Sequence, residues 1–264
     1  MAFPPVKEEA LKHRIPVFQP ATLKTDEAYE ILCNLSPECV VVAAYGKILP
    51  QRILDLPPYG CVNIHGSLLP AYRGAAPIQW AVLNGDPIAG VTTMQMDAGM
   101  DTGDILLTSS CPVPPDMTAG ELFDRLSAMG GELIVKTLQG LEQGTVTPVP
   151  QDASKATAAP MLDRSMSELD FTRPAGELHN QIRGLNPWPS AKTVIAGKTV
   201  KVHASQVLTG GGTPGLLKKG KQLVVQCGNQ TALRLTVIQP EGSRAMSDEE
   251  WLRGHPLADD SMLL

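Results

Sequence analysis

The stretch from Cys61 to Gln79, CVNIHGSLLPAYRGAAPIQ, constrains the fold of this 264-residue chain more than any other. It begins with a short apolar run that contains Val62 and Ile64, a pattern typical of the end of a buried strand. A turn and a run of small residues then lead into a helix that we expect to begin near Ile78. A strand that passes through small residues into a helix commonly forms a ligand crevice in an α/β sheet.

Two polar side chains, Asn63 and His65, lie two residues apart in this strand. Residues i and i+2 of an extended chain point to the same side, so we expect the carboxamide and the imidazole to project into one space. A second polar turn, MDAGMDTGD, runs from Met96 to Asp104. Its glycines relax the backbone while its carboxylates, including that of Asp101, stay available.

The first 150 residues alternate between strand patterns and helix patterns. Cys39–Ala44 is a continuous apolar run, as expected for a strand that is buried on both faces. Further predicted strands are Gly60–Ile64, Val91–Gln95 and its hairpin partner Ile105–Ser109, and the predicted helices are Val6–Lys12, Thr25–Leu35, Ala76–Leu83 and Ala119–Gln143. This alternation predicts an α/β fold with a doubly wound, mostly parallel sheet.

The polar segment from Gln151 to Asp170 is predicted to be a linker, which divides the chain into a unit of residues 1–150 and a second unit of residues 171–264. The second unit begins with a predicted helix, Pro174–Arg183. Short alternating segments with Gly and Pro turns follow it and predict a small β-barrel of the OB type; they are Ala191–Ile195, Thr199–Val202, Leu223–Gln226 and Ala232–Ile238.

A basic patch lies within this second unit, where no Asp or Glu occurs between residues 201 and 240. Its members are Lys201, Lys218, Lys219, Lys221 and Arg234. Such a patch is the footprint expected of a nucleic-acid face, although a solvated lysine turn on a barrel that only packs is the alternative. The net charge of −5 argues against a general nucleic-acid binder, because counterion release needs a basic face.

Composition also indicates in which compartment the protein acts and whether it binds a metal. The five cysteines show no metal-ligand spacing, and we expect reduced thiols in a cytoplasm and no bound metal. No apolar run approaches the roughly 18 residues of a membrane span, so we expect no membrane partner.

The order N-x-H-G-S-L-L-P-x-Y-R-G-A-A-P, followed by an apolar strand and M-D-x-G-x-D-T-G-D, closely resembles the methionyl-tRNA formyltransferase family. The resemblance extends from about Pro4 to the C-terminus and includes N-P-W-P at residues 186–189. It implies a monomeric cytoplasmic enzyme that transfers a formyl group from 10-formyltetrahydrofolate to the amino group of initiator methionyl-tRNA, with a C-terminal tRNA-binding domain.

The chain departs from the family pattern in three places. The strand, Gly-Thr-Pro turn and helix that open the family do not precede Pro4, so we expect a natural start upstream of Met1, or else a different pairing in an oligomer, and one unpartnered flank of the sheet. The linker is acidic where the family carries lysines. Ala71 occupies a position that is usually basic, which would trim an electrostatic contact without touching the reaction.

The resemblance maps the family's catalytic set onto Asn63, His65 and Asp101. Acyl transfer needs an oxyanion donor, a proton carrier and a group that holds the carrier, and a carboxamide, an imidazole and a carboxylate suit these needs. The alternatives are a hydrogen-bonded structural histidine and a turn-capping Asp101, although Asp97 and Asp104 suit that capping role better. The resemblance also implies that the folate is held by Ser67, Leu68, Leu69, Pro70, Lys47, Ile48, Leu49 and Asp97.

Other readings of the same motifs stay open. Arg73 could contact the substrate or pair with a nearby carboxylate. The folate site could serve an amino-sugar acceptor or water, but such enzymes do not need N-P-W-P followed by a basic barrel. An inactive, truncated chain whose barrel only binds RNA would share every motif.

Overall fold

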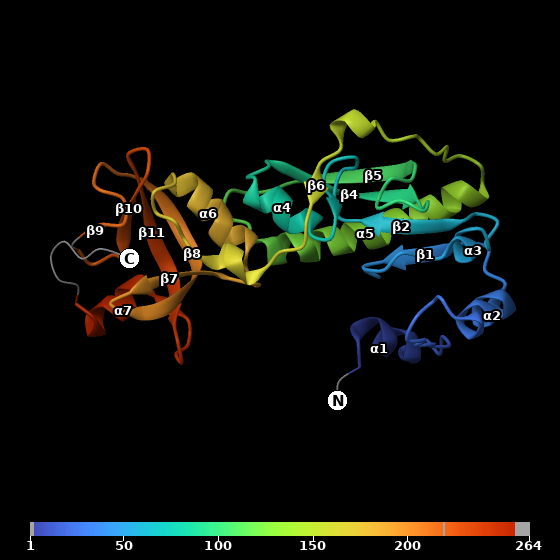
Figure 1. The fold of residues 1–264 in the computed structure, drawn as a ribbon, viewed down its shortest axis with the longest axis horizontal. Helices are drawn as coiled ribbons and strands as arrows, with labels where there is room; N and C mark the ends of the chain where they lie inside the picture. The colour runs from blue at the N-terminus through green and yellow to red at the C-terminus, as the bar shows by residue number, and fades with distance from the viewer. Residues whose placement is uncertain (1–2, 219, 257–264) are drawn as a thin grey trace.

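The first half of the chain builds a four-stranded sheet in the order β1-β2-β4-β5 (Figure 1). The computed structural model describes residues 3–218 and 220–256. The strands of this sheet are β1 (Val40–Ala43), β2 (Cys61–His65), β4 (Ile88–Gln95) and β5 (Ile105–Pro112). β1 and β2 are parallel, whereas β4 runs antiparallel to both β2 and β5. The α/β class is therefore confirmed, but the sheet is mixed and the prediction of a mostly parallel sheet is wrong.

The antiparallel half of the sheet follows from its connections. β4 returns directly into β5 through the polar turn of residues 96–104, as a hairpin must, and this pairing was expected. The connection from β2 to β4 contains the short helix α4 (Pro77–Leu83) and brings the chain back alongside β2 in the opposite direction. Hydrophobic pattern alone does not distinguish these two directions.

Helix α5 (Ala119–Glu142) covers one face of the sheet. Its approach is close, because a Cβ on Gly130 would lie 2.9 Å from the Ile64 side chain. A capping box formed by Thr118 and Glu121 begins the helix and satisfies its first free N–H groups. Since side chains alternate along a strand, Asn63 and His65 lie on the face of β2 opposite to Ile64 and α5.

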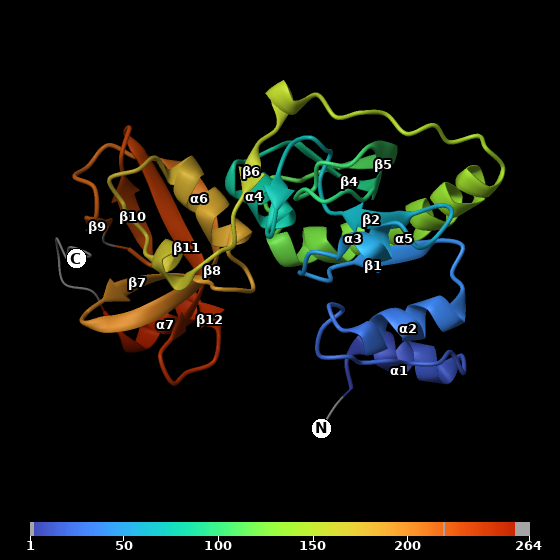
Figure 2. The same ribbon diagram turned by 45° about the vertical axis from the view of Figure 1, so that its right-hand side comes forward.

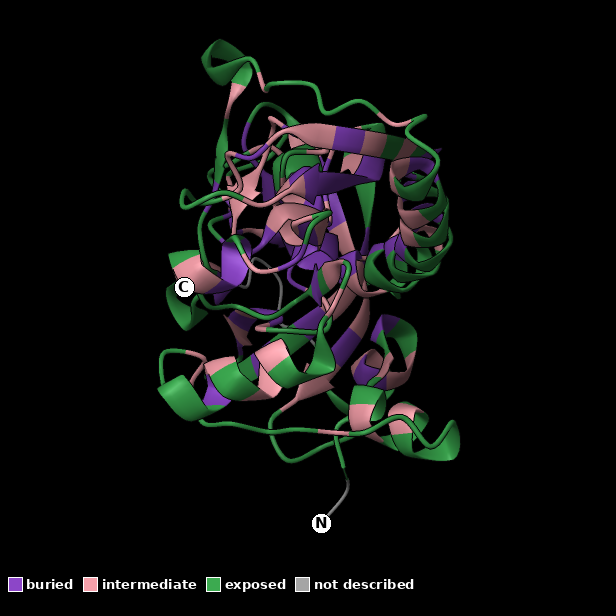
Figure 3. Ribbon diagram, turned by 90° about the vertical axis from the view of Figure 1, so that its right-hand side faces the viewer, coloured by how far each residue is buried: buried purple, intermediate pink, exposed green. Residues whose placement is uncertain are grey.

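The N-terminal elements lie beside β1 (Figure 2). They are the helices α1 (Pro5–Lys12), α2 (Asp26–Leu35) and α3 (Gln51–Leu54). Thr25 caps α2 as its position before the helix suggests, with its side chain accepting from Ala28 N. β1 is an edge strand of the sheet and Val41 is 42% exposed, so the prediction that this strand is buried on both faces is wrong. Figure 3 shows mostly exposed and half-buried surface on the helices near the N-terminus.

The second unit is an antiparallel sheet in the order β7-β8-β11-β10-β9, with β12 paired to β11. Its strands are β7 (Ala191–Ile195), β8 (Lys198–Thr209), β9 (Leu217–Lys218), β10 (Val224–Cys227), β11 (Thr231–Pro240) and β12 (Met246–Ser247). Helices α6 (Ala175–Gly184) and α7 (Asp248–Gly254) pack against it around one apolar core. No strand pairing within residues 3–218 and 220–256 joins β7 to β9, so the predicted small β-barrel takes the form of an open antiparallel sheet.

The segment between the two units is bound to both of them rather than free. It contains two short 3-10 turns, η1 (Ala153–Lys155) and η2 (Arg164–Ser167), and the strand β6 (Ala158–Ala159). β6 pairs in parallel with β3 (Arg73–Gly74) of the first unit. Near the other end, Leu169 N donates to Lys192 O in the second unit. Figures 1 and 2 show the segment returning along the sheet from the end of α5 before it enters the second unit.

Direct contacts also join the two units. A small apolar cluster unites Ala76 of the first unit with Leu185 of the second, together with Leu162 of the segment between them. The Trp80 indole donates to Pro160 O of the same segment over 2.8 Å. The side chain of Arg183 on α6 donates to Met117 O just before α5. The helices of the part of the chain that the structure describes include none that is both long enough and apolar enough to span a bilayer.

Candidate active site

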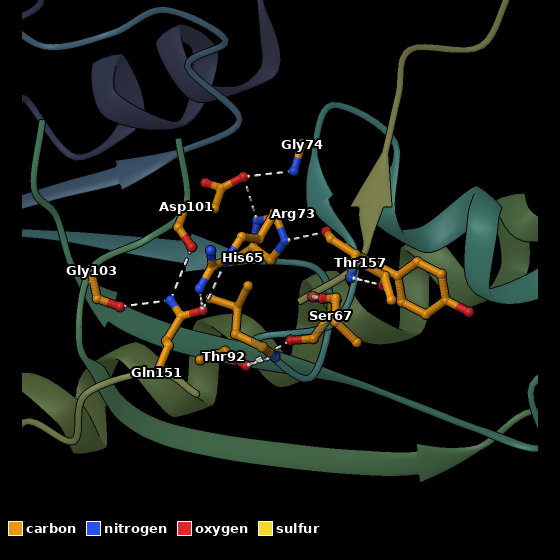
Figure 4. Close-up of polar contacts among 12 residues, drawn as sticks. His65, Ser67, Arg73, Gly74, Thr92, Asp101, Gly103, Gln151 and Thr157 are labelled. Atoms are coloured by element: carbon orange, nitrogen blue, oxygen red, sulfur yellow. Dashed lines mark hydrogen bonds and ion pairs between the residues drawn. The ribbon is translucent and has the colours of Figure 1, made fainter. Parts of the chain in front are cut away.

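The imidazole of His65 is held at the carboxyl end of β2, with its side chain only 6% exposed. Its Nε2 lies 2.9 Å from Tyr72 O. A carbonyl oxygen can only accept a hydrogen bond, so Nε2 carries the hydrogen and donates it. In the neutral ring Nδ1 is then the free acceptor, and it lies 3.7 Å from Asp101 Oδ2 (Figure 4).

Asp101 reaches this place from the turn between β4 and β5. Its backbone is left-handed, with φ of 53°, which is uncommon for a residue other than glycine. Its carboxylate accepts a hydrogen bond of 2.8 Å from Gly74 N and is 16% exposed. The structure therefore brings together two of the three predicted catalytic residues, His65 and Asp101.

Asn63 lies on the same face of β2 as His65 and is half-buried. Among the described residues its carboxamide has no hydrogen-bond partner, so its NH₂ group is available to an oxygen of a ligand. Cys61, two residues earlier on this face, is buried. Burial raises the pKa of the Cys61 thiol to about 11, with smaller contributions from Cys39 and Asp55, so the thiol stays neutral and is a poor nucleophile at neutral pH.

The turn at residues 67–70 is fixed by hydrogen bonds to other residues of the protein. Ser67 Oγ donates to Ala71 O over 2.6 Å. The hydroxyl of Thr92 on β4 donates to Ser67 O and accepts from Leu69 N. The Leu69 side chain is buried, whereas Leu68 and Pro70 are half-buried. The turn can therefore shape one wall of a site, but the Ser67 hydroxyl already has a partner.

The other predicted folate residues differ in what they offer a ligand. Lys47 Nζ donates to Ala21 O over 3.3 Å, and Ile48 is 69% exposed. Leu49 is buried in the apolar cluster that includes residues of α3. The carboxylate of Asp97 accepts from Gly99 N and from the Thr102 hydroxyl, so it caps its own turn. Leu49 and Asp97 therefore offer a ligand mainly their backbone groups.

Sequence reasoning missed the residues that hold the Asp101 turn in place. Arg73 donates from Nε and Nη2 to Gln151 Oε1, not to a carboxylate. Gln151 Nε2 in turn donates to Asp101 O and Gly103 O (Figure 4). Gln151 was assigned to a linker because nothing in the local pattern of a polar segment marks a residue that folds back onto a distant turn.

Two members of the basic patch, Lys218 and Lys221, line a groove of about 900 Å³ in the second unit. Its lining also includes Gly210–Gly212, Gln226 and the acidic residue Glu249. Arg234 is already paired with Asp248 and Glu249. Lys219 lies outside the described residues.

The chain is similar to known proteins over nearly its whole length. The model of the formyl transferase family matches residues 2–138, and the model of the formyl transferase C-terminal domain matches residues 161–256. It is 48% identical to a methionyl-tRNA formyltransferase of Acetivibrio thermocellus, over 99% of this chain and 86% of that one. It is 46% identical to a methionyl-tRNA formyltransferase of Caldanaerobacter subterraneus, over 100% of this chain and 86% of that one.

Solved structures share the fold at low sequence identity. WlaRD, a sugar 3N-formyl transferase solved with dTDP and 5-N-formyl-THF, has a TM-score of 0.67 and 18% identity, with 90% of this chain and 82% of that chain covered. An N-formyltransferase of Helicobacter canadensis, solved with folinic acid and dTDP-3-aminofucose, has a TM-score of 0.64 and 21% identity, with 88% and 81% covered.

Proposed function

The chain belongs to the formyl transferase family, and we propose that it transfers the formyl group of 10-formyltetrahydrofolate to the amino group of methionyl-initiator-tRNA. One observation carries the proposal: the sequence likeness to methionyl-tRNA formyltransferases extends through both units, not only through the one that contains His65. The folate donor has independent support from two solved relatives of the same fold that were crystallised with a formylated folate.

The catalytic roles follow from the balance of the reaction. The amine attacks the formyl carbon, an N–C bond forms, charge collects on the formyl oxygen, and the bond to N10 of the folate breaks. One proton must leave the amine and one must reach N10. The site therefore needs a proton carrier that both accepts and returns a proton, and a donor aimed at the oxygen.

His65 is suited to carry the proton through Nδ1. Because Nε2–H is committed to Tyr72 O, the free lone pair is on the Nδ1 side, which faces Asp101. Asp101 stabilises the imidazolium that forms when Nδ1 takes the proton of the amine. His65 then delivers this proton to the departing folate nitrogen and returns to its neutral state.

Asn63 is suited to stabilise the charge on the formyl oxygen, because its NH₂ group is on the His65 face of β2. The turn at residues 67–70, the backbone at residues 47–49 and the turn at residues 96–101 hold the pterin ring. This assignment is supported by their position around the end of β2 and by the resemblance to the family.

The second unit, residues 171–264, binds the tRNA. Support comes from the groove lined by Lys218 and Lys221, which lie in a segment without acidic residues. Glu249, which also lines the groove, is paired with Arg234. Because the whole chain has a net charge of −5, we place RNA affinity on this local face and not on the molecule at large. The enzyme acts as a monomer in the cytoplasm.

A comparison of three acceptors tests the function. The purified protein is incubated with formyl-labelled 10-formyltetrahydrofolate and one of three acceptors: methionyl-tRNA, a dTDP-linked amino sugar, or water alone. We expect labelled formyl-methionyl-tRNA and no labelled sugar. Label found only in the sugar or only in free formate would overturn the proposed acceptor, and tRNA binding without any transfer would indicate an inactive RNA-binding chain.

A further inference from the structure

We propose that Gln151 is a positioning residue of the active site, which holds the Asp101 turn in its working conformation. The proposal rests on the catalytic role proposed for Asp101. Gln151 comes from the segment between the two units and is half-buried. Its carboxamide lies between the Asp101 turn and the Arg73 side chain (Figure 4).

The hydrogen-bonding capacity of this carboxamide is fully used. Nε2 donates to Asp101 O over 2.9 Å and to Gly103 O over 2.7 Å. Oε1 accepts from Arg73 Nε over 3.1 Å and from Arg73 Nη2 over 2.7 Å. A primary amide has two N–H donors and two acceptor sites, so all four are filled. Arg73 also fixes which end of the amide faces the turn, because a reversed amide would put N–H groups against the guanidinium.

The turn needs such support because its backbone is unfavourable where Asp101 lies. Asp101 has φ of 53°, a conformation that an ordinary L-residue adopts at a cost unless its surroundings hold it. Gly103 is in close contact with β4, since a Cβ there would lie 1.7 Å from Gln95 O. Gln151 donates hydrogen bonds to the carbonyl groups of Asp101 and Gly103. It thereby fixes the backbone from which the Asp101 carboxylate projects toward His65.

The same segment also supports His65. The Thr157 hydroxyl accepts from Tyr72 N over 2.8 Å, and Thr157 O accepts from Arg73 N. Tyr72 O is the acceptor that fixes the hydrogen on His65 Nε2. Residues 151–159 therefore support both His65 and Asp101. Within this segment, Gln151 is the residue whose side chain contacts the Asp101 turn.

The change Gln151→Glu separates this role from packing. It keeps the size and an acceptor for Arg73, but it removes both N–H donors and faces a carboxylate oxygen toward two carbonyl oxygens. With 10-formyltetrahydrofolate and methionyl-tRNA we expect kcat to fall by about 10- to 100-fold. We expect KM for methionyl-tRNA and the melting temperature to stay near those of the wild type.

Asp152→Asn is the matched control, because it makes the reverse exchange between amide and carboxylate one residue away. Among the described residues, the Asp152 side chain forms hydrogen bonds or ion pairs only with its neighbours Ser154 and Lys155, so we expect no change in kcat. A kcat for Gln151→Glu within about twofold of wild type would overturn the proposal. So would a loss of rate that is matched by a large drop in melting temperature, because Gln151 would then serve the fold as a whole.

Hydrogen exchange at the Gly74 amide gives a readout that does not depend on the reaction. This N–H donates to the Asp101 carboxylate, so its protection reports where that carboxylate lies. We expect faster exchange in Gln151→Glu and wild-type exchange in Asp152→Asn. Unchanged protection in Gln151→Glu would contradict the positioning role. If the wild-type protein failed to formylate methionyl-tRNA, the proposed function would fail, and the exchange rates would still decide the role of Gln151.

Discussion

At the scale of single residues, the site depends on which atoms already have partners inside the protein. His65 Nε2 and the Asp101 carboxylate are engaged with backbone groups, which leaves His65 Nδ1 and the Asn63 carboxamide for a ligand. The His65 ring is held by a hydrogen bond at one nitrogen while the other nitrogen stays free, so it needs little reorganisation when charge develops in a transition state.

Replacing Asn63 by Ala removes the proposed oxyanion donor. We expect kcat for formyl transfer to fall by about 10²- to 10³-fold, with little change in KM, because one such donor stabilises a transition state by about 3–4 kcal/mol. Steady-state kinetics with methionyl-tRNA measure the effect. Asn34→Ala, on the exposed side of α2, is the control and should react at the wild-type rate. A wild-type rate in Asn63→Ala would assign the oxyanion contact to another group.

The sequence predicted the residues of this site unevenly. Alternation along one strand was enough to place Asn63 and His65 on one face. Resemblance to the family supplied Asp101, which the structure then brings near His65. Gln151 lacked any such signal, because its importance comes from a return of the chain that no local periodicity encodes.

At the scale of elements, the two-residue strands β3 and β6 connect the site to the segment between the units. Elements this short have no periodic pattern, and they form because the fold brings their backbones together. The short helix α7 was also missed, although Ser247 and Glu250 carry a recognisable capping signal. The longer elements, such as β2 and α5, were predicted because burial and caps mark them in the sequence.

Gly74→Ala tests the β3–β6 pairing. Gly74 has φ of 123°, and a Cβ there would lie 2.7 Å from Ala159 O. We expect the change to cost about 1–3 kcal/mol of unfolding free energy. We also expect a lower kcat, because Gly74 N is a hydrogen-bond donor to Asp101.

Urea denaturation and steady-state kinetics measure these two effects. Gly131→Ala on α5 is the control, because a Cβ there meets nothing within 4 Å and alanine favours a helix. Equal stability and equal rate in Gly74→Ala and the wild type would show that this pairing does not support the site.

At the scale of the whole molecule, each unit has its own core. The direction of strand β4 beside β2 and the open form of the second sheet could not be predicted from the sequence. Both depend on how distant segments pair, whereas hydrophobic patterns report only which side of a strand is buried. The second unit also contains a buried charge, Asp248, which is fully inaccessible. Asp248 accepts from Arg234 over 2.8 Å and from Leu223 N over 3.0 Å.

Asp248→Asn should destabilise the second unit by about 3 kcal/mol, because it leaves Arg234 without its main partner in a largely buried place. Urea denaturation measures the loss. Glu177→Gln is the matched control, since the exposed pair of Glu177 with Arg173 should contribute less than about 1 kcal/mol. Similar losses in the two variants would contradict a structural role for the buried pair.

The same pair predicts a dependence on pH. Burial by itself would raise the pKa of Asp248, but the hydrogen bonds and charge of Arg234, with the Leu223 N–H, outweigh it and lower this pKa. The folded-state pKa is then below the unfolded one. The contribution to stability is therefore present above the unfolded pKa and lost as the pH falls through the folded pKa. In Asp248→Asn, the unfolding free energy should therefore fall less steeply as the pH is lowered.

The most direct test of the account is the single-turnover rate of formyl transfer from 10-formyltetrahydrofolate to methionyl-tRNA in His65→Ala. With both substrates bound, we expect this rate to fall by about 10²- to 10⁴-fold, because the proton of the attacking amine would have no carrier. A rate close to that of the wild type would show that the proton takes another route and that His65 and Asp101 are not the centre of the reaction.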